Sequence, residues 1–244
     1  MLVKSKIKYI QSLGQKKNRD EACVFIAEGP KIVSELLEAD KTERIEIYAV
    51  KDWIIENEKL LAKSTVIEIT EEDLEKISQL KTPNKVLAII NQFATAGTIE
   101  AKGKLTLALC GIQDPGNLGT IIRIADWFGI EQVVCSKDSA DVYNPKVIQS
   151  TMGSIARVNV FYTELEEWLA GQKGINIYAT VLDGQDVTQI KKIEQGIILI
   201  GNESKGISPG ILKLANARIT IPQKGKAESL NAGVATGIVL SHLT

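Results

Sequence analysis

Histidine and cysteine are scarce in this chain of 244 residues. The single histidine, His242, lies two residues from the C-terminus, so a Ser-His-Asp hydrolase triad or a multi-histidine metal site has almost no basis in the composition. Cys23, Cys110 and Cys135 stand far apart in apolar surroundings, which argues against a disulfide framework or a Cys-X-X-Cys metal site. We therefore expect a protein of a reducing compartment, the cytoplasm, without a bound metal.

Long apolar runs are also absent. None approaches the roughly 20 residues that span a bilayer, so no membrane association is expected. The hydrophobic fraction of 44% and the mean hydropathy of +0.02 are those of a soluble globular protein. The length predicts one large or two modest domains, and we favour two. With a formal net charge of −1, any nucleic-acid function has to depend on a local basic patch.

Such a patch is present at the N-terminus. Up to Arg19 every charged side chain is basic, whereas residues 20–75 are rich in carboxylates. A mitochondrial transit peptide is the alternative interpretation, but the segment lacks serine richness and runs without a break into the patterned stretch 24–29. The basic residues are Lys4, Lys6, Lys8, Lys16, Lys17 and Arg19.

Apolar periodicity predicts a small α/β domain in the first part of the chain. Ile7, Ile10 and Leu13 recur at helical spacing and predict a basic helix over 5–19. Pro30 and Thr70 stand where helices would begin, at a first turn and at a cap. The strands are expected over 22–27, 44–50, 65–69 and 86–91, and the other helices over 30–39, near 52–61 and from 71.

The stretch 92–104 contains alanine, threonine and two glycines but few large apolar residues, which is typical of a linker. Beyond it, continuous apolar strands alternate with helices, a pattern that indicates a parallel sheet covered on both faces. We therefore predict one α/β domain over 1–92, a linker over 93–104 and a second α/β domain over 105–244. In the second domain, strands are expected over 105–110, 132–136, 158–161, 175–180, 197–200 and 217–221, and helices over 116–128 and from 145, 164 and 229.

The first of four motifs, residues 114–123, lies at a strand-to-helix turn and contains Asn117 and Arg123. Such a turn exposes backbone N–H groups at the start of a helix, which is a natural anion site. The motif matches neither the dinucleotide fingerprint Gly-X-Gly-X-X-Gly nor the P-loop, so a nicotinamide-dependent oxidoreductase has little support. Taken alone, Gly116 and Gly119 could simply shape a turn and Arg123 could be a solvated helix residue.

The second and third motifs follow two later strands. Residues 144–154 enter a helix and end in small residues, and caps and close packing would explain them without chemistry. Residues 198–207 form a buried strand that ends in a loop framed by Gly201 and Gly206. Because ligands of open α/β sheets bind at the carboxyl ends of strands, this loop lies where a cofactor is expected, although Glu203 could be only a capping carboxylate.

The fourth motif, residues 221–235, runs from a strand through a glycine loop into a helix that we expect Ser229 to cap. The small residues of this helix would permit close packing against other backbone. Packing does not explain why Ser229 and Asn231 flank Leu230.

Together and in this order, the four motifs resemble the SpoU family of RNA 2′-O-ribose methyltransferases within the SPOUT superfamily. The resemblance covers about 105–243 and is carried by the spaced pattern Asn-Leu-Gly…Arg, then Gly-Asn-Glu…Gly, then Ile-Pro…Gly…Ser-Leu-Asn. More loosely, residues 15–19 and 26–29 look like the ribosomal-protein-like substrate-binding domain that precedes many such enzymes.

The resemblance implies a parallel sheet with a deep trefoil knot, an exception to unknotted topology, whose loops bind S-adenosylmethionine. It also implies a homodimer with both sites near the subunit interface. Gln223 replaces a frequent methionine of the family, and Ala232 and Gly233 replace larger apolar residues; these departures concern cofactor packing. The residues that the resemblance places at the cofactor are Thr180, Gly201, Asn202, Gly206, Ile221 and Leu230.

For catalysis the resemblance points to Asn117, Arg123, Glu203, Ser229 and Asn231. Methyl transfer from a sulfonium is an in-line displacement, so the 2′-oxygen must be aligned and must lose its proton. Asn117 and Asn231 would position groups, whereas Glu203 and Ser229 would order the pocket and the nucleophile. A guanidinium stays protonated, so Arg123 would stabilise the developing 2′-alkoxide while a phosphate oxygen or water takes the proton.

RNA would be held through its phosphates, without base readout. Ribosomal RNA is the expected substrate because the N-terminal part looks like that of rRNA enzymes, and tRNA is the alternative. Two more hypotheses stay open: a catalytically silent RNA-binding or ribosome-assembly factor on the same fold, and a SPOUT enzyme that methylates a base nitrogen. The residues expected to contact RNA are Lys16, Lys17, Arg19, Lys146, Arg157, Lys224 and Lys226.

Overall fold

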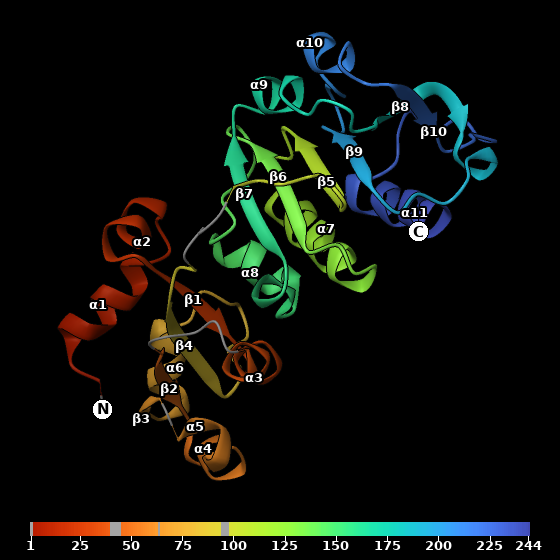
Figure 1. Cartoon of the computed structure of the whole chain (residues 1–244). Helices are drawn as coiled ribbons and strands as arrows, with labels where there is room; N and C mark the ends of the chain where they lie inside the picture. The colour runs from red at the N-terminus through yellow and green to blue at the C-terminus, as the bar shows by residue number, and fades with distance from the viewer. Residues whose placement is uncertain (1, 40–44, 63, 94–97) are drawn as a thin grey trace. The chain divides into compact units, whose positions relative to one another are not determined.

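Figure 1 shows the computed structural model of the chain, which describes residues 2–39, 45–62, 64–93 and 98–244. The chain folds into two compact units. One unit comprises residues 1–94 and 141–156, and the other comprises 95–140 and 157–244. Residues 94–97 of the expected linker lie outside the described residues. No helix of the described part is long and apolar enough to cross a membrane.

The first unit is built on a four-stranded mixed sheet in the order β1-β4-β2-β3. Strand β4 is antiparallel to both β1 and β2, and β3 runs parallel to β2. The bounds are β1 (Val24–Glu28), β2 (Ile45–Ala49), β3 (Thr65–Glu68), β4 (Val86–Asn91), α3 (Pro30–Glu38), α4 (Lys51–Glu56), α5 (Glu58–Leu61) and α6 (Glu71–Ile77). The small α/β domain expected from the sequence is thus confirmed.

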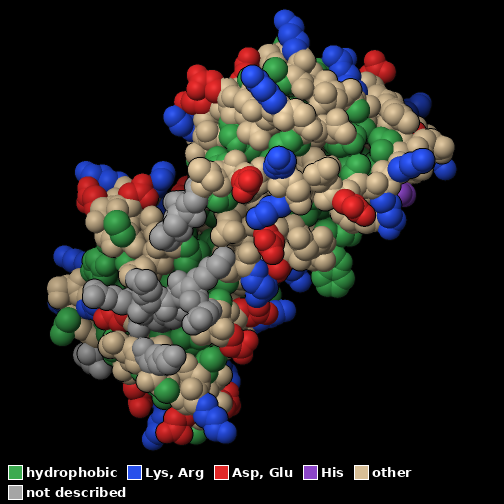
Figure 2. Space-filling view, viewed as in Figure 1, with side chains coloured by type: hydrophobic (Ala, Val, Ile, Leu, Met, Phe, Trp, Pro, Cys, Tyr) green, Lys and Arg blue, Asp and Glu red, His purple; other side chains and the backbone are tan. Residues whose placement is uncertain are grey.

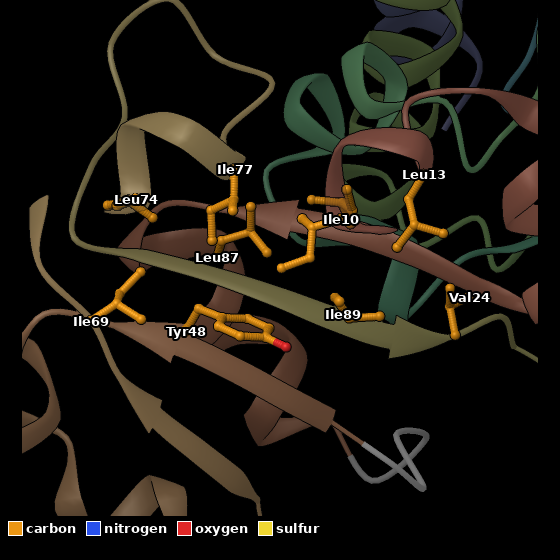
Figure 3. Packing of buried hydrophobic residues seen from close by; sticks show 10 residues of the cluster. Ile10, Leu13, Val24, Tyr48, Ile69, Leu74, Ile77, Leu87 and Ile89 are labelled. Atoms are coloured by element: carbon orange, nitrogen blue, oxygen red, sulfur yellow. The ribbon is translucent and has the colours of Figure 1, made fainter. Parts of the chain in front are cut away.

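Local signals explain where these elements begin and what they bury. The Thr70 side chain accepts a hydrogen bond from the Asp73 N–H at 3.2 Å, as its predicted role as cap of α6 requires. One apolar cluster lies where the N-terminal helices and α6 pack on the sheet, and Figure 3 shows Ile10, Leu74, Ile77 and Leu87 pointing toward one another. All four are at most 2% exposed, so this cluster is a true core.

The predicted continuous helix over 5–19 was wrong. Two helices, α1 (Lys4–Ser12) and α2 (Lys16–Ala22), occupy this stretch and are separated at residues 13–15. A Cβ at Gly14 would lie 2.8 Å from Gln79 Oε1, which is the end of a flexible side chain and can move aside. The Arg19 guanidinium closes the break, because its Nη1 donates to the carbonyl oxygens of Leu13 and Gly14, each at 2.9 Å.

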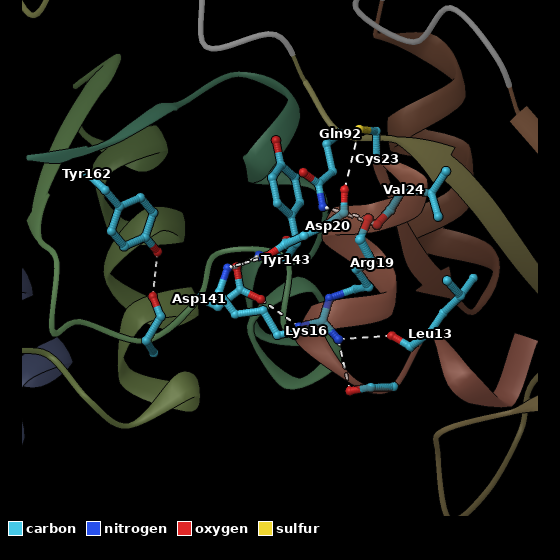
Figure 4. A network of polar contacts seen from close by, with 12 residues as sticks. Leu13, Lys16, Arg19, Asp20, Cys23, Val24, Gln92, Asp141, Tyr143 and Tyr162 are labelled. Carbon is cyan, nitrogen blue, oxygen red and sulfur yellow. Dashed lines mark hydrogen bonds and ion pairs between the residues drawn. The ribbon is translucent and has the colours of Figure 1, made fainter.

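Arg19 is buried, with 1% of its surface exposed, and it forms an ion pair with Asp141 at 2.6 Å (Figure 4). Next to Asp141, the Tyr143 ring stacks on Phe25 with 5.1 Å between centroids, and the Tyr143 hydroxyl accepts from the Phe93 N–H at 2.8 Å. These contacts hold residues 141–156, with α8 (Pro145–Thr151) and η1 (Ser154–Ala156), in the first unit.

Helix capping and close packing explain the second motif, residues 144–154. Asn144 caps α8 by accepting from the Lys146 N–H at 2.8 Å. Gly153 has a φ of +97°, and a Cβ there would lie 2.6 Å from the Cβ of Glu35 on α3. Capping and close packing account for these residues, as the alternative interpretation of this motif held.

The second unit contains a six-stranded sheet in the order β10-β8-β9-β5-β6-β7, and all neighbouring pairs are parallel. The predicted parallel sheet is thus confirmed. The bounds are β5 (Leu105–Cys110), β6 (Gln132–Ser136), β7 (Asn159–Thr163), β8 (Ile177–Asp186), β9 (Gly196–Gly201), β10 (Ala217–Thr220), α7 (Pro115–Trp127), α9 (Leu165–Ala170), η2 (Val187–Gln189), α10 (Pro209–Leu212) and α11 (Ala232–Leu243).

Both faces of this sheet are covered, as the continuous apolar strands predicted. Ala108, Val134 and Leu199 pack in one cluster with α9 and α10. Their strand neighbours Leu107 and Ile198 point to the opposite face and are also fully buried. Helix α11 packs there against α7 and β9. With both faces closed, the loops at the carboxyl ends of the strands are the natural place for a ligand.

Two details of this unit differ from the expectation. Strand β8 extends to Asp186, because its pairing with β10 shifts register between Arg218 and Ile219 and resumes at Gln185. The cap of α11 is Asn231 and not Ser229: the Asn231 side chain accepts from the N–H groups of Gly233 and Val234 at 3.0 and 3.2 Å. Asparagine and serine are about equally good caps, so the sequence did not decide between them.

The Arg19–Asp141 pair generates a stability prediction. Replacing Asp141 by Ala leaves a buried guanidinium without its counter-charge, and we expect this to lower the free energy of unfolding by about 3 kcal/mol. Replacing Lys17, which is exposed and pairs loosely with Glu21 at 3.8 Å, should cost less than about 0.5 kcal/mol. Urea unfolding of both variants measures the difference, and equal costs would show that the buried pair is unimportant.

Candidate active site

Three loops meet above the centre of the parallel sheet. The strands β9 and β5 are neighbours in the sheet, so the loops that follow them lie side by side at the carboxyl edge. The loop after β5 leads into α7, and the loop after β9 contains Glu203. The third loop, residues 221–231, connects β10 to α11.

The side chains of Asn117, Glu203 and Asn231 form a connected chain of hydrogen bonds. The Asn117 Nδ2 donates to Glu203 Oε1, and the Asn231 Nδ2 donates to Asn117 Oδ1 at 2.7 Å. Because Asn231 Oδ1 is occupied as the cap of α11, its Nδ2 is oriented toward Asn117. The structure therefore brings three of the five predicted catalytic residues together, one from each loop region.

The close approach of α7 and α11 makes this contact possible. A Cβ at Gly233 would lie 2.9 Å from Thr120 Cγ2, so the departure of this sequence toward a small residue at position 233 lets the two helices touch. At the start of α7, Asp114 accepts from the Asn117 N–H at 2.9 Å and caps the helix. Asp114 thus fixes the backbone of Asn117, and the capping role of Asn231 fixes the Asn231 side chain.

Asn202 shapes the loop that carries Glu203. Its Oδ1 accepts from the N–H groups of Ser204 and Lys205 at 2.9 and 3.0 Å, and its Nδ2 donates to the Gly111 carbonyl at 2.7 Å. The loop closes tightly, because a Cβ at Gly201 would lie 2.7 Å from the Gly206 backbone, and Gly206 has a φ of +66°. The Asn202 amide is therefore committed to loop structure.

The loop 221–231 has the properties of a cofactor cradle. Among the described residues, none of the backbone N–H groups of residues 223–230 donates a hydrogen bond within the chain, so these donors are available to a ligand. Leu230 is 45% exposed and Ile221 is half-buried, which provides apolar surface beside the donors. Gln223, the departure from the frequent methionine, ties the loop to itself by donating to the Ala227 carbonyl at 2.6 Å.

This combination fits S-adenosylmethionine. Its adenine and methionyl groups need backbone hydrogen bonds together with apolar contact, and loop 221–231 offers both. Thr180, the remaining residue expected at the cofactor, is half-buried, and its hydroxyl donates to the Leu199 carbonyl at 2.8 Å. It lies where β8 leaves its first pairing with β10.

Two predicted catalytic residues, Arg123 and Ser229, are not joined to these contacts. Both are exposed, and within the described residues neither side chain has a hydrogen bond or ion pair with Asn117, Glu203 or Asn231. Arg123 follows Asn117 by six residues in α7, which places it about 120° around the helix axis. It therefore faces a different direction from Asn117.

The basic residues expected to contact RNA differ in their surroundings. Lys16 and Lys17 are exposed but pair along α2 with Asp20 at 2.9 Å and Glu21 at 3.8 Å. Arg19 is buried, so an RNA contact by its side chain does not fit this structure. Lys146, Lys224 and Lys226 are exposed. On the face seen in Figure 2, basic and acidic side chains are interspersed.

Arg157, Cys110 and Cys135 have surroundings that limit their reactivity. Arg157 donates to both carboxylate oxygens of Asp126, from Nε to Oδ1 at 3.1 Å and from Nη2 to Oδ2 at 2.8 Å. Burial raises the pKa of the Cys110 and Cys135 thiols, so both stay protonated at neutral pH and are poor nucleophiles. In the described part of the chain, no group of His, Cys, Asp and Glu side chains could hold a metal ion.

Comparison with known proteins identifies the family. The sequence model described as the SpoU rRNA Methylase family matches residues 104–241, and the one described as the MRM3-like substrate binding domain matches residues 4–88. The chain belongs to the SpoU rRNA methylase family. This membership confirms the predicted activity: the protein is an RNA 2′-O-methyltransferase that uses S-adenosylmethionine.

Relatives and solved structures agree with this family. The 23S rRNA (guanosine(2553)-2′-O)-methyltransferase RlmP of Bacillus subtilis is 30% identical, with 98% of this chain and 95% of that protein aligned. A crystal structure of an AdoMet-bound rRNA methyltransferase from Sinorhizobium meliloti has a TM-score of 0.86 and 31% identity, and the match covers 100% of this chain and 95% of that one. A TrmH-family protein from Porphyromonas gingivalis has a TM-score of 0.86 and 35% identity, covering 100% and 98%.

The arrangement of Asn231 predicts a separation of stability from activity. Replacing Asn231 by Asp retains a good helix cap, so the free energy of unfolding should change by less than about 0.5 kcal/mol. The new carboxylate can no longer donate to Asn117 Oδ1 and would repel that oxygen. We expect methyl transfer to fall on the order of 100-fold through misplacement of the Asn117 side chain.

The control is Asn231→Ala, which should lose activity and also about 1 kcal/mol of stability with the cap. Thermal unfolding and initial rates of methyl transfer to RNA measure the two effects. Wild-type turnover by Asn231→Asp would contradict the importance of the Asn231–Asn117 contact.

Proposed function

We propose that this protein methylates the 2′-hydroxyl of one ribose in ribosomal RNA. The observation that supports the site of reaction is the Asn117–Glu203–Asn231 chain of hydrogen bonds beside the donor-rich loop 221–231. The rRNA target is favoured by the match to an MRM3-like substrate binding domain over residues 4–88 and by the aligned rRNA enzyme of Bacillus subtilis. A cytoplasmic location would suit this substrate.

In the proposed reaction, the bound cofactor supplies a methyl group on a sulfonium. The chain's residues would have to align the ribose 2′-oxygen for this transfer while its proton leaves to a phosphate oxygen or water. Loop 221–231, with Ile221 and Leu230, would hold the cofactor, together with Thr180, Gly201 and Gly206. Asn202 would contribute by shaping its loop, since its amide is already hydrogen-bonded.

The remaining chain groups would position the ribose. Asn117, Glu203 and Asn231 form one rigid polar surface on which the ribose hydroxyls could be aligned. Ser229 precedes this surface by two residues and has an exposed hydroxyl. Arg123 would stabilise the developing 2′-alkoxide through its permanent charge.

Because Arg123 points away from Asn117 within one chain, we propose that it acts in a homodimer. Trp127 follows Arg123 by one helical turn and therefore lies on the same face of α7. It is 84% exposed, and Val234 on the adjacent α11 is 51% exposed. These two exposed apolar side chains suit contact with a second copy of the chain, which would place its Arg123 near the first copy's loops.

RNA would be held by its backbone, with Lys16, Lys17, Lys146 and Lys224 as the candidate contacts. The pairing of Lys16 and Lys17 with acidic neighbours on α2 lowers the net charge of that surface. Because residues 4–88 match an MRM3-like substrate binding domain, we still assign the larger share of substrate recognition to the first unit. We leave the buried Arg19 out of the RNA surface.

The proposed function is tested by mapping 2′-O-methyl groups. In rRNA and tRNA from cells that lack the gene, we expect the loss of one ribose methyl in rRNA and its return with the wild-type gene but not with Asn117→Ala. Mass spectrometry of nuclease fragments gives the position. Loss of a methyl group from tRNA would show that tRNA is the substrate and not rRNA. Retention of every methyl group would contradict the proposed activity and favour an RNA-binding factor.

The proposed dimer predicts the effect of a charge on α7. Replacing Trp127 by Glu should convert the dimer to a monomer in light scattering and reduce methyl transfer at least about 10-fold, because a charge buried without a partner opposes association. The matched control is Ile55→Glu, a substitution at another exposed apolar residue, 64% exposed, in the first unit. A dimer that persists in Trp127→Glu would place the subunit contact elsewhere.

A further inference from the structure

We propose that Ser136 and Asp138 are positioning residues for Glu203 and act through the peptide backbone of Gly111. This inference rests on the proposed function, because it assigns the two residues to the same reaction. Neither belongs to the four sequence motifs, and neither was expected at the site. They follow β6, which neighbours β5 in the sheet.

Gly111 is held from both sides of its Cα. Its N–H donates to Ser136 Oγ at 2.8 Å, and its carbonyl accepts from Asn202 Nδ2 at 2.7 Å. Gly111 has a φ of +67°, and a glycine has more backbone freedom than any other residue. Two hydrogen bonds on opposite sides of one Cα are therefore what fixes the two adjoining peptide planes.

Asp138 sets the direction of the Ser136 hydroxyl. The Ser136 Oγ donates to Asp138 Oδ1 at 2.5 Å, which leaves a lone pair of Oγ for the Gly111 N–H. A Cβ at position 111 would lie 3.2 Å from Asp138 Oδ2, so the carboxylate also packs over the glycine. A hydroxyl oriented by a carboxylate is a stronger acceptor than an isolated one.

The same loop is tied to the strand end β5 a second time. The Ala140 N–H donates to the Ile112 carbonyl at 2.8 Å, and the Tyr162 hydroxyl donates to the Ala140 carbonyl (Figure 4). Residues 136–140 therefore form a brace along residues 111 and 112. The brace is connected to Glu203 through Asn202, the residue that precedes Glu203, because Asn202 Nδ2 donates to the Gly111 carbonyl.

Gly111 lies between the two segments that carry Asn117 and Glu203, so its backbone position affects both residues. On one side it leads to Asp114, the cap of α7, and so to Asn117; on the other side, through Asn202, it leads to Glu203. Asn117 and Glu203 are hydrogen-bonded to each other. A shift of the Gly111 backbone would move one partner relative to the other, and misplacement of this kind affects turnover more than binding.

The experiment compares Ser136→Ala with Ser136→Thr, which keeps the hydroxyl, and Asp138→Ala with Asp138→Asn, which keeps an oxygen acceptor. We expect the alanine variants to lower kcat about 10-fold with the KM for RNA and for S-adenosylmethionine within about twofold, while the conservative variants regain most of kcat. A general loss of folding would instead lower the active fraction and would appear as a lower unfolding midpoint.

A double-mutant cycle tests whether the effect passes through Glu203. In a Glu203→Asp background, Ser136→Ala should change kcat less than about twofold, because the positioned group is already displaced. A full 10-fold effect in both backgrounds would show that Ser136 acts independently and would overturn the proposal, as would unchanged kcat or an effect on KM alone.

Hydrogen exchange provides a readout that needs no substrate. The N–H groups of Ser204, Lys205 and Gly206 are held by Asn202, so Ser136→Ala should speed their exchange severalfold while Lys137→Ala, at an exposed neighbour, leaves it unchanged. Unchanged protection would overturn the brace. Faster exchange together with a wild-type protein that methylates no RNA would instead refute the proposed function and retain the brace.

Discussion

The parallel alignment of all six strands in the second unit is the constraint on which its site depends. Parallel strands end at one edge, so the loops after β5, β6 and β9 have to lie beside one another. Helices cover both faces of the sheet. Asn117 and Glu203 can therefore meet although a large part of the domain separates them in sequence.

In the first unit, the buried charge of Arg19 brings together segments that are distant in sequence. The Arg19 guanidinium joins the break between α1 and α2 to Asp141, a residue from a distant part of the sequence. Such a pair is costly to desolvate, and its value lies in fixing one arrangement. The family match over residues 104–241 includes residues 141–156, yet these residues pack in the first unit. Sequence families and compact units thus divide this chain differently.

Periodicity predicted most strands, and it predicted β4, β5 and β6 to the residue, because buried strands have continuous apolar runs with clear ends. It failed over 5–19, where the helical spacing of Ile10 and Leu13 continues through Gly14 although the chain breaks there. The break is closed by the Arg19 guanidinium, which is held in turn by the distant residue Asp141. Local sequence does not contain that information.

The site shows the same limit. The resemblance of the four motifs to the SpoU family pointed to Asn117, Glu203 and Asn231, and each of these residues follows a strand end or begins a helix. It did not find Ser136 and Asp138, because a Ser-X-Asp pair after a strand is typical of an ordinary turn. Their importance arises from their contacts with the Gly111 peptide. A contact with a backbone group does not depend on a particular side chain, so the sequence shows only the glycine. Residues that act through the backbone are found by following hydrogen bonds in the structure, here to the loop after β6, the strand next to β5.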